Sequence, residues 1–83
     1  MDIVIGADHA GFALKQKLIE HLQGRKMAYE DVGCFSEDSV DYPDISRQVA
    51  ERMAGDAHSR GVICCGSGIG VAMAANRFHH IRA

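Results

Sequence analysis

The residues best suited to chemistry lie in one stretch of the chain, residues 61–70, which has the sequence GVICCGSGIG. A short apolar run ends at Cys65 and is followed at once by Gly66, Ser67 and Gly68, a pattern that predicts a buried strand turning into a helix. The first N–H groups of a helix have no partners within it, so they can bind a phosphate or a developing oxyanion. Because such positions favour thiolates, Cys65 is placed to act as a general base or nucleophile.

The other two cysteines are predicted to have no chemical role. Strand alternation points Cys64 away from Cys65, and cysteine is among the most buried residue types. Cys34 is predicted to be a thiol in a loop or at the end of a strand. A glycine-rich turn between a strand and a helix can itself be purely structural, so the rest of the chain must decide.

A second group of candidate residues follows the predicted first strand. The carboxylate of Asp8 can accept a hydrogen bond from a sugar hydroxyl, and the imidazole of His9 can donate one to a phosphate. The structural alternative is an aspartate that caps the first helix and a histidine exposed in a turn. Tyr42, which precedes Pro43, either covers a ligand or anchors its loop through its ring.

The elements that must position these residues alternate regularly. Strands are predicted at residues 2–6, 27–32 and 61–65, and helices at residues 10–22, 44–54 and 68–78. This alternation predicts a parallel α/β sheet with right-handed crossovers. Ligands of such sheets bind beyond the carboxyl ends of the strands, where the candidate residues lie.

The helices carry their own signals. Leu14, Leu18 and Leu22 predict the face of the first helix that packs on the sheet, and Gly24 is predicted to stop it. Asp44 is predicted to cap the second helix, whose buried face is predicted to carry Ile45, Val49 and Met53. Asn76 and Arg77 are predicted to be solvated or capping groups at the end of the third helix.

The last residues, 79–83, predict the start of a fourth strand at Ile81. Three parallel strands leave an open sheet edge, which favours completion by further chain or by association. We assign no role to the remaining histidines, which are predicted to lie on the surface or at helix ends: His21, His58, His79 and His80.

Composition limits the class of protein. The chain has 83 residues, of which 47% are hydrophobic and 24% charged, as expected for one soluble globular domain. The net charge of −2 and the lack of a basic stripe argue against nucleic-acid binding. We expect neither a membrane span nor a metal site, because no long apolar run, CxxC or HExxH is present. An odd number of cysteines, three, predicts a reducing, cytoplasmic setting.

Three motifs, GADHAGFALK near the N-terminus, DYP at residues 41–43 and CGSGIG followed by AANR, resemble those of the type B ribose-5-phosphate isomerases. That family also includes galactose-6-phosphate and allose-6-phosphate isomerases. The resemblance implies a Rossmann-like three-layer α/β/α sandwich with five parallel strands in the order 2-1-3-5-4, of which this chain would supply 2-1-3. It also implies a homodimer or homotetramer that needs no metal or cofactor and acts on a sugar phosphate.

The resemblance assigns a role to each candidate residue. Cys65 would be the base that moves a proton between C1 and C2 through a cis-enediolate, because Val71 stands where one subgroup carries a glutamate base. Asp8 would bind sugar hydroxyls and help ring opening, His9 would reach the phosphate, and Tyr42 would line the sugar. The developing oxyanion would be held by five backbone amides, with help from the serine hydroxyl: Gly66, Ser67, Gly68, Ile69 and Gly70.

The chain also departs from the family pattern. Ala7 replaces a frequent cysteine, and His80 replaces a common glycine. Family members run to about 150 residues, an ordinary size for one domain, and their second half supplies a histidine, an asparagine and phosphate-binding arginines. We therefore expect residues 1–83 to be a single domain that forms the N-terminal part of such an isomerase, with little activity alone. The alternatives are an inactive phosphate-binding or assembly module, an isomerase of six-carbon sugar phosphates, and a redox sensor that uses Cys64 and Cys65.

Overall fold

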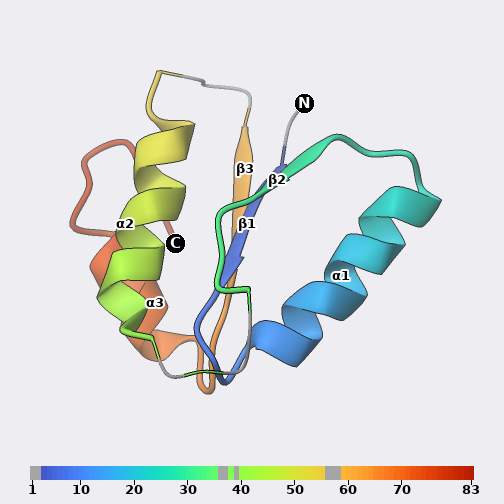
Figure 1. The fold of residues 1–83 in the computed structure, drawn as a ribbon. Helices are drawn as coiled ribbons and strands as arrows, with labels where there is room; N and C mark the ends of the chain where they lie inside the picture. The colour runs from blue at the N-terminus through green and yellow to red at the C-terminus, as the bar shows by residue number, and fades with distance from the viewer. Residues whose placement is uncertain (1–2, 36–37, 39, 56–58) are drawn as a thin grey trace.

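The computed structural model describes residues 3–35, 38, 40–55 and 59–83. Its three strands and three helices alternate as predicted, and the strands form one parallel sheet in the order β2-β1-β3. Helix α1 lies on one side of the sheet, and α2 and α3 lie on the other, which confirms the three-layer α/β/α fold (Figure 1). In chain order the elements are β1 (Ile3–Ala7), α1 (Phe12–Gly24), β2 (Tyr29–Asp31), α2 (Tyr42–Met53), β3 (Arg60–Cys64) and α3 (Ile69–Ala75).

The central strand β1 sets the register of the sheet. Ile5 pairs with Asp31 of β2 and with Val62 of β3, and Ala7 pairs with Cys64. β1 is nearly inaccessible to solvent, since Ile5 and Ala7 are both fully buried. The residues that directly follow β1 and β3 therefore leave the sheet side by side at its carboxyl end.

The face with which α1 packs differs from the prediction. Leu22 is buried and Leu18 is half-buried, but Leu14 is 53% exposed. Lys15 takes the buried position instead and has no exposed surface. The reason is an ion pair, in which the Lys15 ammonium lies 2.7 Å from a carboxylate oxygen of Asp31. An apolar periodicity alone does not reveal such a partner.

The first helix also ends later than predicted. Gly24 is the last helical residue, and Arg25 follows it as the C-cap. The left-handed residue that completes the turn is Lys26, with φ of 56°, whose N–H donates to the Gln23 carbonyl. The glycine therefore does not supply the left-handed stop that its position suggests.

The predicted cap of the second helix is wrong. α2 begins two residues earlier, with Asp41 as its N-cap and Pro43 in its first turn. Proline suits that turn because its φ is already helical and no N–H bond is lost there. Asp44 lies inside the helix, exposed, with its carboxylate 3.9 Å from the Arg47 guanidinium.

The buried face of α2 agrees with its pattern and also carries a polar contact. Ile45 and Val49 are buried, and Met53 is half-buried. The hydroxyl of Ser46, fully buried, donates to the Val71 carbonyl at 3.0 Å and so joins α2 to α3. This bond fixes the helix that follows the glycine-rich turn.

The C-terminal residues do not form the predicted fourth strand. α3 is shorter than expected, and the chain then turns, with the Ile81 N–H donating to the Phe78 carbonyl. The Asn76 side chain accepts from and donates to the backbone of Ala83, and the His80 ring nitrogen lies 2.7 Å from the Ala50 carbonyl. Asn76 thus caps the helix, as predicted, and residues 79–83 lie back toward α2.

Among the residues that the structure describes, no strand pairs with the outer edge of β3. A groove of about 860 Å³ runs along that edge between α2 and the last residues. His21 and His79 are exposed, and the prediction for His58 lies outside the described residues. No helix in the part of the chain that the structure describes is long and apolar enough to cross a membrane.

Candidate active site

The glycine-rich turn places the Cys65 thiol at the carboxyl end of β3. The strand ends at Cys64, one residue earlier than predicted, and Cys65 is half-buried at the start of the turn. Gly68 closes the turn in the left-handed region, with φ of 77°, and its N–H donates to the Cys65 sulfur at 2.9 Å. A backbone N–H directed at sulfur stabilises negative charge there.

Two of the predicted oxyanion-binding amides have partners within this turn. That of Gly68 points at Cys65, and that of Ile69 donates to the Ser67 hydroxyl oxygen at 3.2 Å. The Ile69 side chain is 65% exposed. The turn is therefore an ordered loop around the thiol, open to solvent at Gly66, Ser67 and Gly68.

Cys64 differs from its neighbour as predicted. It is buried among the strands, and burial raises the pKa of its thiol above the ordinary value of 9.0. The charges of Cys65 and Asp8 raise this pKa further, and Lys15 opposes them in part. Cys64 therefore remains a protonated thiol at neutral pH.

We expect iodoacetamide to label Cys65 before Cys64. Burial and the raised pKa keep the Cys64 thiolate scarce, whereas Cys65 is half-buried at the start of the turn. Labelling at pH 8, with the modified residue located by tandem mass spectrometry, should show faster reaction at Cys65. Buried Cys34 serves as the internal control, and faster reaction at Cys64 would contradict this assignment of the two thiols.

Asp8 lies beside the Cys64–Cys65 peptide because β1 and β3 are neighbours. Its N–H donates to the Cys64 carbonyl at 3.1 Å, which continues the ladder one residue beyond β1. Its carboxylate is buried, and one oxygen accepts the N–H of Gly11 at 2.9 Å. Because Gly11 is the N-cap residue of α1, Asp8 also binds the start of that helix, as the alternative of a helix-capping aspartate predicted.

Gly11 is a positioning residue that we did not single out from the sequence. A Cβ built on it would collide with the Cys64 carbonyl oxygen and would lie 2.7 Å from the Cys65 nitrogen. Only glycine lets the start of α1 approach the backbone of the site so closely. The available signal was its place in GADHAGFALK, directly before the helix.

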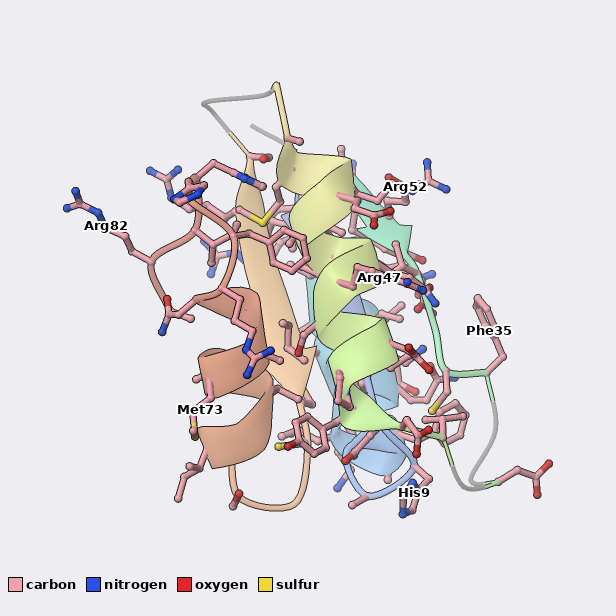
Figure 2. The ribbon with its side chains drawn as sticks, turned by 90° about the vertical axis from the view of Figure 1, so that its left-hand side faces the viewer. His9, Phe35, Arg47, Arg52, Met73 and Arg82 are labelled. Carbon is pink, nitrogen blue, oxygen red and sulfur yellow. The ribbon has the colours of Figure 1, made fainter. Side chains whose placement is uncertain are left out.

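His9 follows Asp8 and is held by the loop that precedes α2. The Val40 N–H donates to its Nδ1 at 3.2 Å. An Nδ1 that accepts a hydrogen bond leaves the proton of a neutral imidazole on Nε2, which is then a donor. Figure 2 shows His9 at the same end of the molecule as the start of α2.

Tyr42 reaches the site from the first turn of α2. Two of its ring carbons, Cε1 and Cζ, lie 2.8 Å from the place that a Cβ on Gly70 would occupy. Tyr42 is 43% exposed as a whole residue, so it packs on the glycine in part and faces solvent in part. Both predicted roles, covering the site and anchoring the loop, fit this position.

We expect Gly70→Ala to push the Tyr42 ring into solvent. Because Tyr42 is already 43% exposed and its ring can turn away, the free energy of unfolding should change by less than about 1 kcal/mol. Acrylamide quenching of tyrosine fluorescence in a Tyr29→Phe background, where Tyr42 is the remaining tyrosine, should increase. Unchanged quenching would mean that the ring does not pack on Gly70.

The structure thus brings Asp8, His9, Tyr42 and the turn after Cys65 to one end of the sheet. The groove along β3 is a separate feature, whose lining shares only Gly68 with this group. Within the described ranges, no cluster of three or more His, Cys, Asp or Glu residues is arranged to hold a metal ion.

The fold and this site define a Rossmann-like α/β protein whose candidate site residues follow the carboxyl ends of adjacent parallel strands. The sequence profile described as "Ribose/Galactose Isomerase" matches residues 3–83. The chain therefore belongs to the ribose/galactose isomerase family.

Individual relatives support the same assignment. The chain is 42% identical over 83 residues to the ribose-5-P isomerase B of Listeria innocua, covering 100% of this chain and 56% of that protein. The ribose-5-phosphate isomerase B structure from Clostridium thermocellum superposes with a TM-score of 0.94 at 40% identity, covering 99% of this chain and 55% of that one.

A third relative was solved with a sugar phosphate. The structure of ribose-5-phosphate isomerase B from Mycoplasma genitalium with bound ribulose-5-phosphate has a TM-score of 0.89 at 34% identity. The match covers 96% of this chain and 54% of that one. The chain spans about half the length of the curated relatives it matches.

Proposed function

We propose that this chain acts in an aldose–ketose isomerase that interconverts ribose 5-phosphate and ribulose 5-phosphate, with Cys65 as the base. The observation that carries the proposal is the position of the Cys65 thiol. The thiol is half-buried at the carboxyl end of β3 and accepts the Gly68 N–H at 2.9 Å. Because β3 pairs with β1, Cys65 and Asp8 follow neighbouring strands at the same end of the sheet.

In the proposed reaction the Cys65 thiolate takes the proton from C2 of the open-chain aldose. The C2–H electron pair forms the C1–C2 double bond, and the carbonyl oxygen becomes the oxyanion of a cis-enediolate. Cys65 then returns the proton to C1, and the O2 proton moves to O1 as the C2 carbonyl forms. The amides of Gly66, Ser67 and Gly70 hold the oxyanion, with the Ser67 hydroxyl assisting. The other two amides of the predicted set, of Gly68 and Ile69, donate within the turn and instead order it around the thiol.

The remaining residues bind the substrate. Asp8 orients sugar hydroxyls through the carboxylate oxygen that Gly11 leaves free and assists ring opening. His9 donates its Nε2–H to the phosphate, a role that the Val40 contact to Nδ1 supports. The Tyr42 ring covers one side of the sugar, in line with its packing on Gly70.

The size of the relatives supports a proposal about organisation. We propose that residues 3–83 correspond to the N-terminal part of an isomerase domain and act within a homodimer or homotetramer. A site shared with further residues also explains why we expect little turnover from this chain by itself. The relative bound to ribulose-5-phosphate favours a five-carbon substrate for this chain as well.

The proposed function is tested by adding ribose 5-phosphate, allose 6-phosphate and galactose 6-phosphate separately to the protein. We expect slow but detectable formation of ribulose 5-phosphate, followed by NMR over long incubation, and still slower or no conversion of the two six-carbon sugars. Calorimetry on the same samples measures binding. Tight binding without any conversion would overturn the proposal in favour of a phosphate-binding module, and faster conversion of a six-carbon sugar would reassign the substrate.

A further inference from the structure

One buried charge in the structure has no part in the proposed reaction. Lys15 has no exposed surface, and its ammonium lies 2.8 and 2.7 Å from the two carboxylate oxygens of Asp31. The rings of Phe12 and Phe35 flank it, each with its centroid 5.3 Å from the ammonium. A lysine is almost never fully buried, and removing its charge from water is costly even when it is paired.

The ion pair fixes the point at which the chain leaves β2. Oδ1 of Asp31, which binds Lys15, also accepts the Gly33 N–H at 2.9 Å. Gly33 adopts φ of 111°, a left-handed conformation that favours glycine. Its carbonyl accepts the Ala7 N–H at 2.7 Å, and the next N–H, from Cys34, donates to the Ala7 carbonyl at 2.8 Å. Asp31 thus anchors the exit of β2 against the residue that directly precedes Asp8.

The loop between β2 and α2 also contacts the site at its C-terminal end. Val40 donates its N–H to His9 Nδ1, and two residues later Tyr42 lies against Gly70. The loop between β2 and α2 is therefore attached to the β1 end first through Gly33 and then through Val40. These two attachments lie on either side of Asp8, at Ala7 and at His9.

We propose that Lys15, through Asp31, is a positioning residue for His9, the group that would donate to the substrate phosphate. The pair holds the Gly33 turn against Ala7, two residues before His9, and so keeps the His9 ring where the Val40 N–H meets Nδ1 and leaves the proton on Nε2. An apolar residue at position 15 would leave the half-buried Asp31 carboxylate without its cation, so the aspartate would turn toward water and release Gly33. This inference rests on the proposed function for the role of His9, but its main readout does not need catalysis.

The test is the tautomer of His9 in Lys15→Met, which keeps the length of the side chain and removes its charge. Imidazole ¹⁵N chemical shifts of the neutral ring should show a protonated Nε2 and a bare Nδ1 in the unaltered protein. In Lys15→Met the two shifts should move toward each other as both tautomers become populated. Affinity for inorganic phosphate should fall by roughly ten-fold, within the range that small misplacements of binding groups produce.

A second variant guards against a simple loss of folding. Lys15→Met/Asp31→Leu removes both members of the pair, so no unpaired charge is left buried, and such replacements are often tolerated. The double variant should fold and still show the mixed His9 tautomers, because Gly33 has lost its acceptor. Wild-type His9 shifts in the folded double variant would overturn the proposal and leave the pair a purely structural role.

The matched control is Arg52→Met. Arg52 forms an exposed ion pair with Glu30, the residue before Asp31, at 3.1 Å. Figure 2 shows Arg52 toward the opposite end of α2 from His9. Its loss should leave the His9 shifts and phosphate affinity unchanged, and an equal effect from this variant would also refute a specific role for Lys15. If the unaltered protein binds no phosphate, the proposed function fails, whereas the tautomer measurement still decides the inference.

Discussion

Replacing Cys65 with alanine should lower the rate of ribose 5-phosphate isomerisation by about 1,000-fold, since a positioned general base contributes roughly 10²–10⁴-fold. The methyl group cannot take the C2 proton, and the amides that surround it remain to bind the oxyanion. The free energy of unfolding should change by less than about 1 kcal/mol, because Cys65 is half-buried and its side-chain contact is one N–H from Gly68. Initial rates at saturating substrate measure the effect.

The control for this prediction is Cys64→Ala. Cys64 has the same side chain as Cys65 and lies one residue away, but it is buried and its raised pKa keeps it protonated. We expect this variant to lose some stability through the cavity it creates and to retain most of its isomerase rate. An equal loss of rate in the two variants would indicate that the effect comes from packing and not from a base.

The second large effect is expected from Gly11→Ala, which should destabilise the fold by about 3 kcal/mol, at the upper end of what overpacking costs. The new methyl group would meet the Cys64 carbonyl oxygen and the Cys65 nitrogen, which are backbone atoms that cannot rotate away. Since φ of Gly11 is −95°, the cost comes from this collision and not from backbone conformation. Urea unfolding followed by circular dichroism measures it.

A matched control lies at the other end of the same helix. A Cβ on Gly24 would meet nothing within 4 Å, so Gly24→Ala should stabilise the protein by up to about 1 kcal/mol through helix propensity. If Gly11→Ala were as mild as Gly24→Ala, α1 would not need to approach the Cys64–Cys65 peptide, and the positioning of Asp8 would need another explanation.

The order of the elements was predictable because the chain marks it with local signals. β-Branched runs ending in glycine identify β1 and β3, and the motif after Cys65 identifies the turn. The pairing of β1 with β3, which brings Asp8 beside that turn, did not follow from these signals; it was expected from the strand order 2-1-3 that the family resemblance implied. The element order needs only the local signals, so it holds even where the boundaries are off by one or two residues.

The contacts that position the site could not be predicted in the same way. Lys15 is buried and Leu14 is exposed, the reverse of what an apolar stripe indicates, because the partner of Lys15 lies 16 residues away in β2. The close approach at Gly11 likewise depends on the backbone of β3, more than 50 residues later. Such features depend on the assembled fold, and local spacing does not contain them.

The start of α2 also differs from the prediction, for another reason. An aspartate before an apolar periodic run is typical of a cap, which favoured Asp44. Pro43 instead begins the helix earlier, and this places Tyr42 in the first turn, where its ring reaches Gly70. The correct boundary matters for function because it brings the ring to the site.

The most direct test of the central claim is exchange of the C2 proton of ribose 5-phosphate in D₂O. A base that takes this proton trades it for solvent deuterium, so even slow turnover leaves deuterium in the sugar, measurable by NMR and mass spectrometry. We predict that the unaltered protein and Cys64→Ala incorporate solvent deuterium into the sugar. Cys65→Ala should still bind the sugar but incorporate no deuterium into it. Undiminished exchange in Cys65→Ala would contradict the assignment of Cys65 as the base.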